Sequence, residues 1–126
     1  MKLILDAGAL IALERGHQEM WFRFNAARAA TTAPISHGGV IGQVWRGGGA
    51  RQVRLARALV GLHIRPLDAA LGRAAGMLLA RTGQRDVIDA ALVLLARDGD
   101  RIITSDPEDL APLARAADLD VELVRP

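Results

Sequence analysis

Short segments of mostly apolar residues alternate along the chain with longer segments in which apolar residues recur every three or four positions. The short segments predict strands at residues 2–6, 31–36, 63–67, 101–105 and 121–124. The longer segments predict helices at residues 9–14, 17–30, 38–46, 50–61, 68–81, 86–99 and 107–117. Strands that alternate with helices indicate a mainly parallel sheet covered on both faces. The expected fold class is therefore α/β.

Length and composition fit one domain that spans residues 1–126, because about half of the residues (51%) are hydrophobic. The sequence has no cysteine, which excludes disulfides and thiolate metal sites. Asp6 interrupts the first apolar run, so this run is a poor match to a signal peptide. No stretch offers the ~20 apolar residues of a membrane span. We expect a cytoplasmic protein that does not act in a membrane.

The net charge is only +2, but the charges are unevenly distributed. No acid occurs between Glu19 and Asp68, and this stretch contains seven arginines: Arg23, Arg28, Arg46, Arg51, Arg54, Arg57 and Arg65. Arginines without neighbouring acids attract phosphate groups. A solvated basic surface is the alternative interpretation.

Acidic residues stand where a parallel sheet would gather them. Asp6 ends the first predicted strand, and Asp106 follows the fourth. Ligands of open α/β sheets bind at the carboxyl ends of the strands, where the strand order reverses. Asp86 and Asp89 are three residues apart and share one face of a helix that is otherwise apolar. Carboxylates from three elements at one sheet edge are typical of a site for Mg²⁺ or Mn²⁺.

Helix capping is the alternative explanation for most of these acids. Asp86 with Asp89, and Asp106 with Asp109, have the spacing of an N-cap residue and the third residue of a helix. Acids in a first helical turn are also favoured by the helix dipole. For Asp6, the only structural use that the sequence suggests is to cap a short helix. Capping and metal binding both stay open for Asp86 and Asp109.

Three segments, "LILDAGALIAL", "DVIDAALVLLA" and "IITSDPEDL", resemble in this order and spacing the PIN-domain family, in particular the VapC-like toxins of bacterial toxin–antitoxin pairs. The resemblance covers essentially the whole chain. It implies a three-layer α/β/α sandwich and a ribonuclease that depends on Mg²⁺ or Mn²⁺. It also implies a frequent homodimer and an antitoxin that inserts a segment into the acidic cleft.

The family's acids correspond to particular residues of this chain. The first acid is Asp6, the helical acid is Asp89 with Asp86 as an accessory, and the late acid is Asp106 with Asp109 beside it. The resemblance also places a hydroxyl, here Thr104, just before the late acid. Candidates for binding the RNA substrate are Arg46, Arg51, Arg54, Arg57 and Thr104.

Two positions depart from the family pattern. Gln43 stands where the family has its second acid, a glutamate, and Gly8 stands where the family tends to have Ser, Thr or Asn. Gln43 is therefore a second-tier metal ligand, and Glu14 is a possible substitute for the missing acid. An RNA- or protein-binding module without nuclease activity stays open as the alternative function. A receiver-type phosphoacceptor domain is excluded, because it needs a late lysine and the only lysine is Lys2.

Aromatic residues are few, and two of them are adjacent in the helix predicted at residues 17–30. Trp21 and Phe22 cannot both face a core easily, so we expect them to form, with the helix at residues 50–61, an interface with a second copy or with an antitoxin. The alternative is that one ring packs inside and the other is partly exposed.

Overall fold

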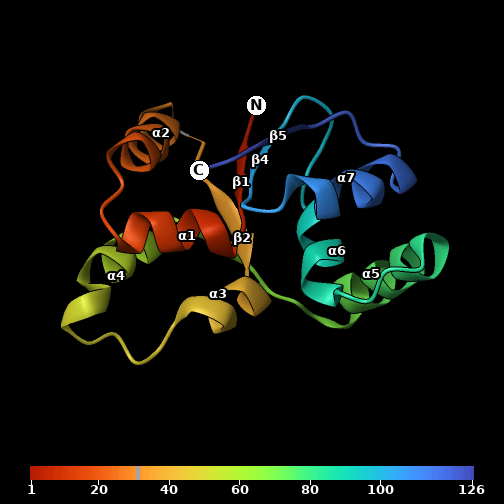
Figure 1. The fold of residues 1–126 in the computed structure, drawn as a ribbon, viewed down its shortest axis with the longest axis horizontal. Helices are drawn as coiled ribbons and strands as arrows, with labels where there is room; N and C mark the ends of the chain where they lie inside the picture. Colours follow the sequence, from red (N-terminus) through yellow and green to blue (C-terminus); the bar gives the residue numbers. More distant parts are fainter. Residues whose placement is uncertain (31) are drawn as a thin grey trace.

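The computed structural model describes residues 1–30 and 32–126, and its elements follow the predicted alternation closely (Figure 1). The strands are β1 (Leu3–Leu5), β2 (Ile35–His37), β3 (His63–Arg65), β4 (Arg101–Ile103) and β5 (Glu122–Val124). The helices are α1 (Ala7–Glu14), α2 (Gln18–Ala29), α3 (Gly38–Val44), α4 (Val53–Val60), α5 (Ala69–Thr82), α6 (Val87–Val93) and α7 (Pro107–Ala116), with a 3-10 turn, η1 (Ala50–Gln52), before α4. The predicted strand at residues 31–36 includes Thr31, which lies outside the described residues.

The described strands form one sheet in the order β3-β2-β1-β4-β5, and every pair of neighbours is parallel. Ile4 in the centre of β1 pairs with Ile35 on one side and with Ile102 on the other. The chain proceeds from β1 toward β3 in one direction and then resumes at β4 on the opposite side of β1. The strand order therefore reverses between β1 and β4, which is where α/β folds place their ligand sites.

Helices cover both faces of the sheet. Helices α2, α3 and α4 each contact α1, and α5, α6 and α7 contact one another. Figure 1 shows these two groups on opposite sides of the strands, so the fold is the expected α/β/α arrangement of three layers. Within the described residues, none of the helices has the length and apolar character needed to cross a membrane.

The sheet is buried at its centre because helices lie on both of its faces. Ile4, Leu5, Ile102 and Ile103 are fully buried, which explains why β1 and the last two residues of β4 are apolar without alternating polar residues. Each of these two strands is followed by a polar residue, which is Asp6 after β1 and Thr104 after β4.

The predicted helix at residues 86–99 is wrong at its end, since α6 stops at Val93. Leu95 and Ala96 donate backbone hydrogen bonds three residues back, to Leu92 and Val93, which tightens the chain into turns. Asp100, only 4% exposed, then accepts hydrogen bonds from the backbone N–H groups of Arg97 and Lys2. These bonds turn the chain into β4, so a tertiary contact near the N-terminus overrides the local helical pattern.

Candidate functional site

A pocket of about 390 Å³ opens at the carboxyl ends of β1 and β4. It is lined by five aspartates singled out from the sequence, which are Asp6, Asp86, Asp89, Asp106 and Asp109. The other lining residues are Ala7, Gly8, Gln43 and Arg46. The acids come from the end of β1, the start of α6 and the start of α7. The convergence expected from strand ends and one helix start is therefore present.

Asp6 is held by short hydrogen bonds and is only 7% exposed. Its Oδ1 accepts from the N–H of Ala7, at 2.7 Å, and thereby caps α1. Its Oδ2 accepts from the hydroxyl of Thr104, at 2.8 Å. These two donors offset the cost of burying the carboxylate and fix its orientation at the pocket wall.

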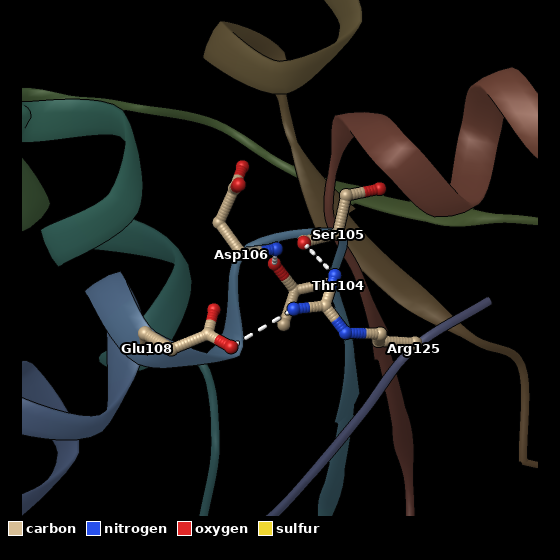
Figure 2. Close-up of polar contacts among 5 residues, drawn as sticks. All are labelled: Thr104, Ser105, Asp106, Glu108 and Arg125. Atoms are coloured by element: carbon tan, nitrogen blue, oxygen red, sulfur yellow. Dashed lines mark hydrogen bonds and ion pairs between the residues drawn. The ribbon is translucent and has the colours of Figure 1, made fainter.

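Thr104 positions the acids, and it cannot bind substrate directly because it is fully buried. Its hydroxyl donates to Asp6 and accepts from the backbone N–H of Asp106, at 3.0 Å (Figure 2). One hydroxyl thus connects the acid after β1 to the acid after β4. The expectation that Thr104 contacts RNA is wrong for this physical reason.

The loop after β4 is also held from its outer side, by a residue that the sequence reasoning missed. Arg125 donates to the carbonyl of Ser105, at 2.6 Å, and to the carboxylate of Glu108, at 2.9 Å (Figure 2). The backbone carbonyl of Arg125 in turn accepts from Arg23. No local pattern in the sequence marks Arg125, because its partners lie 17 and 20 residues away.

The capping alternatives are resolved differently for the two pairs of acids. Asp86 caps α6, since its Oδ1 accepts from the N–H groups of Ile88 and Asp89. Asp106 precedes α7 but makes no capping hydrogen bond with its side chain. Its carboxylate is exposed and faces the pocket, with Asp109 one turn further along. Asp86 thus has a structural role, whereas that of Asp106 is not explained by capping.

Crowding of carboxylates changes the acidity of Asp89. Its pKa is raised from 3.8 to about 7, first by burial and then by the negative charges of Asp86, Asp6, Asp109 and Asp106. Near neutral pH, Asp89 is therefore protonated in a large fraction of molecules. A cation among these groups would relieve the repulsion and favour the ionised form.

The types of side chain in the pocket fit a hard divalent cation, because carboxylate and amide oxygens are the ligands that Mg²⁺ and Mn²⁺ prefer. Over residues 1–30 and 32–126, no three histidine or acidic side chains are already arranged as a metal-binding group. The electrostatic coupling of Asp89 to four other acids nevertheless places their charges near one another. The donors fit the ion in chemistry and charge.

Gln43 lies in the pocket, and Glu14 does not. Glu14 is at the far end of α1 from Asp6, where its carboxylate accepts from Gln52 Nε2 at 2.6 Å. The suggestion that Glu14 substitutes for the missing acid is therefore wrong. Arg46 shares the pocket with Gln43, and its guanidinium donates to the carbonyls of Gly42 and Trp45.

The four arginines proposed for RNA are divided between different hollows. Arg46, Arg51 and Arg54 line a groove of about 750 Å³ together with Arg15, and Arg46 also lines the acidic pocket. Arg57 lines a different hollow, which includes Trp21 and Phe22, and Arg54 lines both. None of these arginines makes an ion pair with another described residue. Arg51 belongs to η1 and precedes α4, so these arginines do not all project from one helix.

Gln52 fixes the loop that connects the groove to the pocket, and the sequence reasoning missed it as well. Gln52 is 6% exposed and accepts from the backbone N–H groups of Arg46 and Gly48. Its amide donates to the carbonyl of Val44 and to Glu14. A glutamine inside a basic, polar stretch carries no signal of burial, so only the fold reveals this role.

The two adjacent aromatic residues differ in burial. Trp21 is half-buried, packs edge-on against Phe24 and donates its indole N–H to the carbonyl of Leu13. Phe22 is 74% exposed. As the alternative expected, the two rings differ in burial, but Trp21 is only half-buried and Phe22 is more exposed than that alternative supposed, so Phe22 remains a candidate interface residue.

Comparison with known proteins supports the fold and goes no further. No protein-family model matches the chain, and no curated protein matches its sequence. Among solved structures, the chain is similar to a chain in the crystal structure of VapBC2 from Rickettsia felis, which is bound to a DNA fragment from the VapBC2 promoter. The TM-score is 0.69 over 98% of each chain, at 14% sequence identity. The class defined by this likeness is an α/β protein with a PIN-like fold.

The raised pKa of Asp89 predicts a stability that falls as pH rises. Ionising Asp89 costs the folded state nothing below pH 4, and the cost grows between pH 4 and about 7. Asp89→Asn should therefore match the wild type at pH 4 and exceed it by about 1–2 kcal/mol at pH 7.5, a value reduced because the site is half open to water. Urea unfolding in EDTA measures this difference. The matched control is Asp68→Asn, which exchanges one capping residue for another outside the pocket. Parallel stability curves for wild type and Asp89→Asn would contradict the expectation.

Proposed function

We propose that this protein is a divalent-metal-dependent ribonuclease, similar to VapC toxins, which hydrolyses RNA phosphodiester bonds in the cytoplasm. The observation that carries the proposal is the convergence of Asp6, Asp89 and Asp106 in one pocket where the strand order reverses. The raised pKa of Asp89 supports it, because crowded carboxylates are costly without a cation. The PIN-like fold is the second support.

Asp6, Asp89 and Asp106 are the proposed metal ligands and catalytic residues, with Asp86, Asp109 and Gln43 as secondary ligands. A bound Mg²⁺ or Mn²⁺ supplies a water of lowered pKa and neutralises charge on the phosphate. Thr104 holds Asp6 and Asp106 in fixed positions relative to each other through its two hydrogen bonds. Asp86 is partly committed to capping α6, so it contributes mainly negative charge.

The RNA backbone is proposed to lie in the arginine groove and to enter the acidic pocket beside Arg46, because Arg46 lines both. Arg51 and Arg54 project into the same groove and make no ion pair with described residues, so their charges are available to phosphates. Arg57 lines the hollow with Phe22 and does not line the arginine groove, so it is not proposed to bind RNA.

A partner is proposed for the hollow of about 630 Å³ between α2 and α4. An exposed phenylalanine beside Trp21, rimmed by Arg28, Arg54 and Arg57, suits an acidic, partly apolar segment. An antitoxin is the proposed occupant, and the VapBC2 complex with the same fold supports it. A homodimer through this surface is the second possibility.

One observation favours a different function. Gln43 lines the pocket where a nuclease of this family has an acid, and its amide carries no charge. With one negative charge fewer, attraction for Mg²⁺ is weaker, and the protein could bind RNA without cleaving it.

The variant Gln43→Glu decides between these functions. Adding a sixth carboxylate to the pocket should lower the concentration of Mg²⁺ or Mn²⁺ needed for half-maximal cleavage of total RNA, by about tenfold. Titration of both metals against wild type and variant measures this shift, with Asp6→Asn as the inactive control. Coincident titrations would show that Gln43 does not influence the metal. If neither protein cleaves while both bind RNA, the binding-module function is correct.

The arginine groove predicts a particular salt dependence. Arg51→Gln with Arg54→Gln should lower the slope of log K against log salt by about 1.4, since each phosphate contact on single-stranded RNA contributes about 0.7. Filter binding of a single-stranded RNA oligonucleotide in Ca²⁺ measures the slope. Arg73→Gln with Arg81→Gln removes the same charge from exposed positions of α5, in the opposite layer, and should leave the slope unchanged. An equal decrease in both variants would mean that net charge alone is responsible.

Exposed Phe22 predicts that self-association depends on its ring. Light scattering of the isolated protein should show a dimer that Phe22→Glu converts to a monomer, because a charge in the hollow opposes burial of an apolar contact. Met77→Glu alters an equally exposed apolar residue on α5 and serves as the control. A wild type that is monomeric at every concentration would remove the homodimer and leave the hollow to a protein partner.

A further inference from the structure

Ser105 packs so closely against Gly8 that a side chain at position 8 would overlap it. A Cβ atom added to Gly8 would overlap the Ser105 Oγ and would lie 2.8 Å from the Ser105 Cβ. Real Cβ atoms do not approach other carbon atoms so closely, so α1 and the loop after β4 fit together only because position 8 lacks a side chain. The serine hydroxyl thus sits in the volume that a side chain at position 8 would take.

The Ser105 hydroxyl makes no hydrogen bond with another described residue, and Ser105 is exposed. The backbone on either side is fixed, because Thr104 is buried against Asp6 and Arg125 binds the Ser105 carbonyl. In Figure 2 the side chains of Ser105 and Asp106 extend away from the Arg125 guanidinium and the Glu108 carboxylate. The backbone that carries the Ser105 hydroxyl is thus fixed, and the exposed hydroxyl beside Gly8 is open to a ligand.

The wall beside this hydroxyl belongs to the acidic pocket, since Gly8 is one of its lining residues. Carboxylates repel a phosphate oxygen, so a polynucleotide that enters the pocket needs donors at its wall. A serine hydroxyl supplies one without adding charge. It therefore lowers the cost of approach without competing with a cation for the acids.

We propose that Ser105 contacts a phosphate oxygen of the RNA substrate, with its hydroxyl standing in from the loop after β4 for a side chain at position 8. This inference rests on the proposed ribonuclease function. Gly8 is then required by Ser105, and the two positions behave as one unit. This contact strengthens binding of the RNA backbone and does not distinguish one base sequence from another.

Moving the hydroxyl between the two positions tests the proposal. Affinity for a fluorescent single-stranded RNA oligonucleotide is measured by anisotropy in Ca²⁺, and KM and kcat for its cleavage are measured in Mn²⁺. Ser105→Ala should weaken binding about five- to tenfold and raise KM by the same factor, as expected for the loss of one hydrogen bond. Ser105→Thr, which keeps the hydroxyl, should bind within about twofold of the wild type.

Two double variants provide the matched comparison. Gly8→Ser with Ser105→Gly removes the overlap and returns a hydroxyl at position 8, so it should recover most of the affinity lost in Ser105→Ala. Gly8→Ala with Ser105→Gly removes the same overlap without a hydroxyl and should not recover it. Thermal unfolding of each variant monitors the fold, and the pair Ser105→Ala and Ser105→Thr decides the matter if a double variant does not fold.

The outcomes separate this inference from the proposed function. If the wild type binds and cleaves RNA but Ser105→Ala does the same, or the two double variants bind equally, the role of Ser105 is wrong and the nuclease stands. If the wild type neither binds nor cleaves RNA at any metal concentration, the proposed function is wrong and the inference is overturned with it.

Discussion

The pocket depends on the hydrogen bond between Asp6 and Thr104. This bond joins the residue after β1 to the residue after β4, across the point where the strand order reverses. It offsets the burial of the Asp6 carboxylate, and through the N–H of Asp106 it also sets where α7 begins. The acids at the end of β1 and just before α7 therefore take their positions from one buried hydroxyl. Loss of that hydroxyl would leave a buried carboxylate short of a donor.

Much of the fold and of the acidic pocket could be predicted from the sequence because both follow from local patterns. Apolar runs that end on an acid predict parallel strands with acids at one edge, and Asp6 and Asp106 are found there. The contacts that the sequence did not reveal all join distant residues. Asp100 reaches Lys2 to end the helical stretch early, and Gln52 reaches Glu14, so neither effect has a local signal. Thr104 was recognised as a hydroxyl of the site, but its burial, and hence its positioning role, depends on the helices that cover the sheet.

Charge in the pocket is balanced by a small number of groups. Five carboxylates line it, and Arg46 is the positive side chain among the lining residues. The guanidinium of Arg46 donates to backbone carbonyls and is not paired with any of the acids, so the repulsion that raises the pKa of Asp89 is not relieved by the protein itself. An amide at position 43 makes this repulsion smaller than a glutamate would. An amide at this position therefore also lowers the cost of gathering the five carboxylates in one pocket.

The two departures from the family pattern have different physical consequences. At position 43 a charge is absent, and no described neighbour supplies it, because Glu14 is committed to Gln52 at the other end of α1. At position 8 a side chain is absent, but Ser105 fills the space it would have taken, so the wall of the pocket keeps a polar group there. A missing charge acts on the cation through long-range attraction, whereas a displaced hydroxyl acts only on what touches it. In the proposed nuclease, position 43 would therefore set how strongly the pocket attracts metal, and positions 8 and 105 together would set how closely a phosphate can approach.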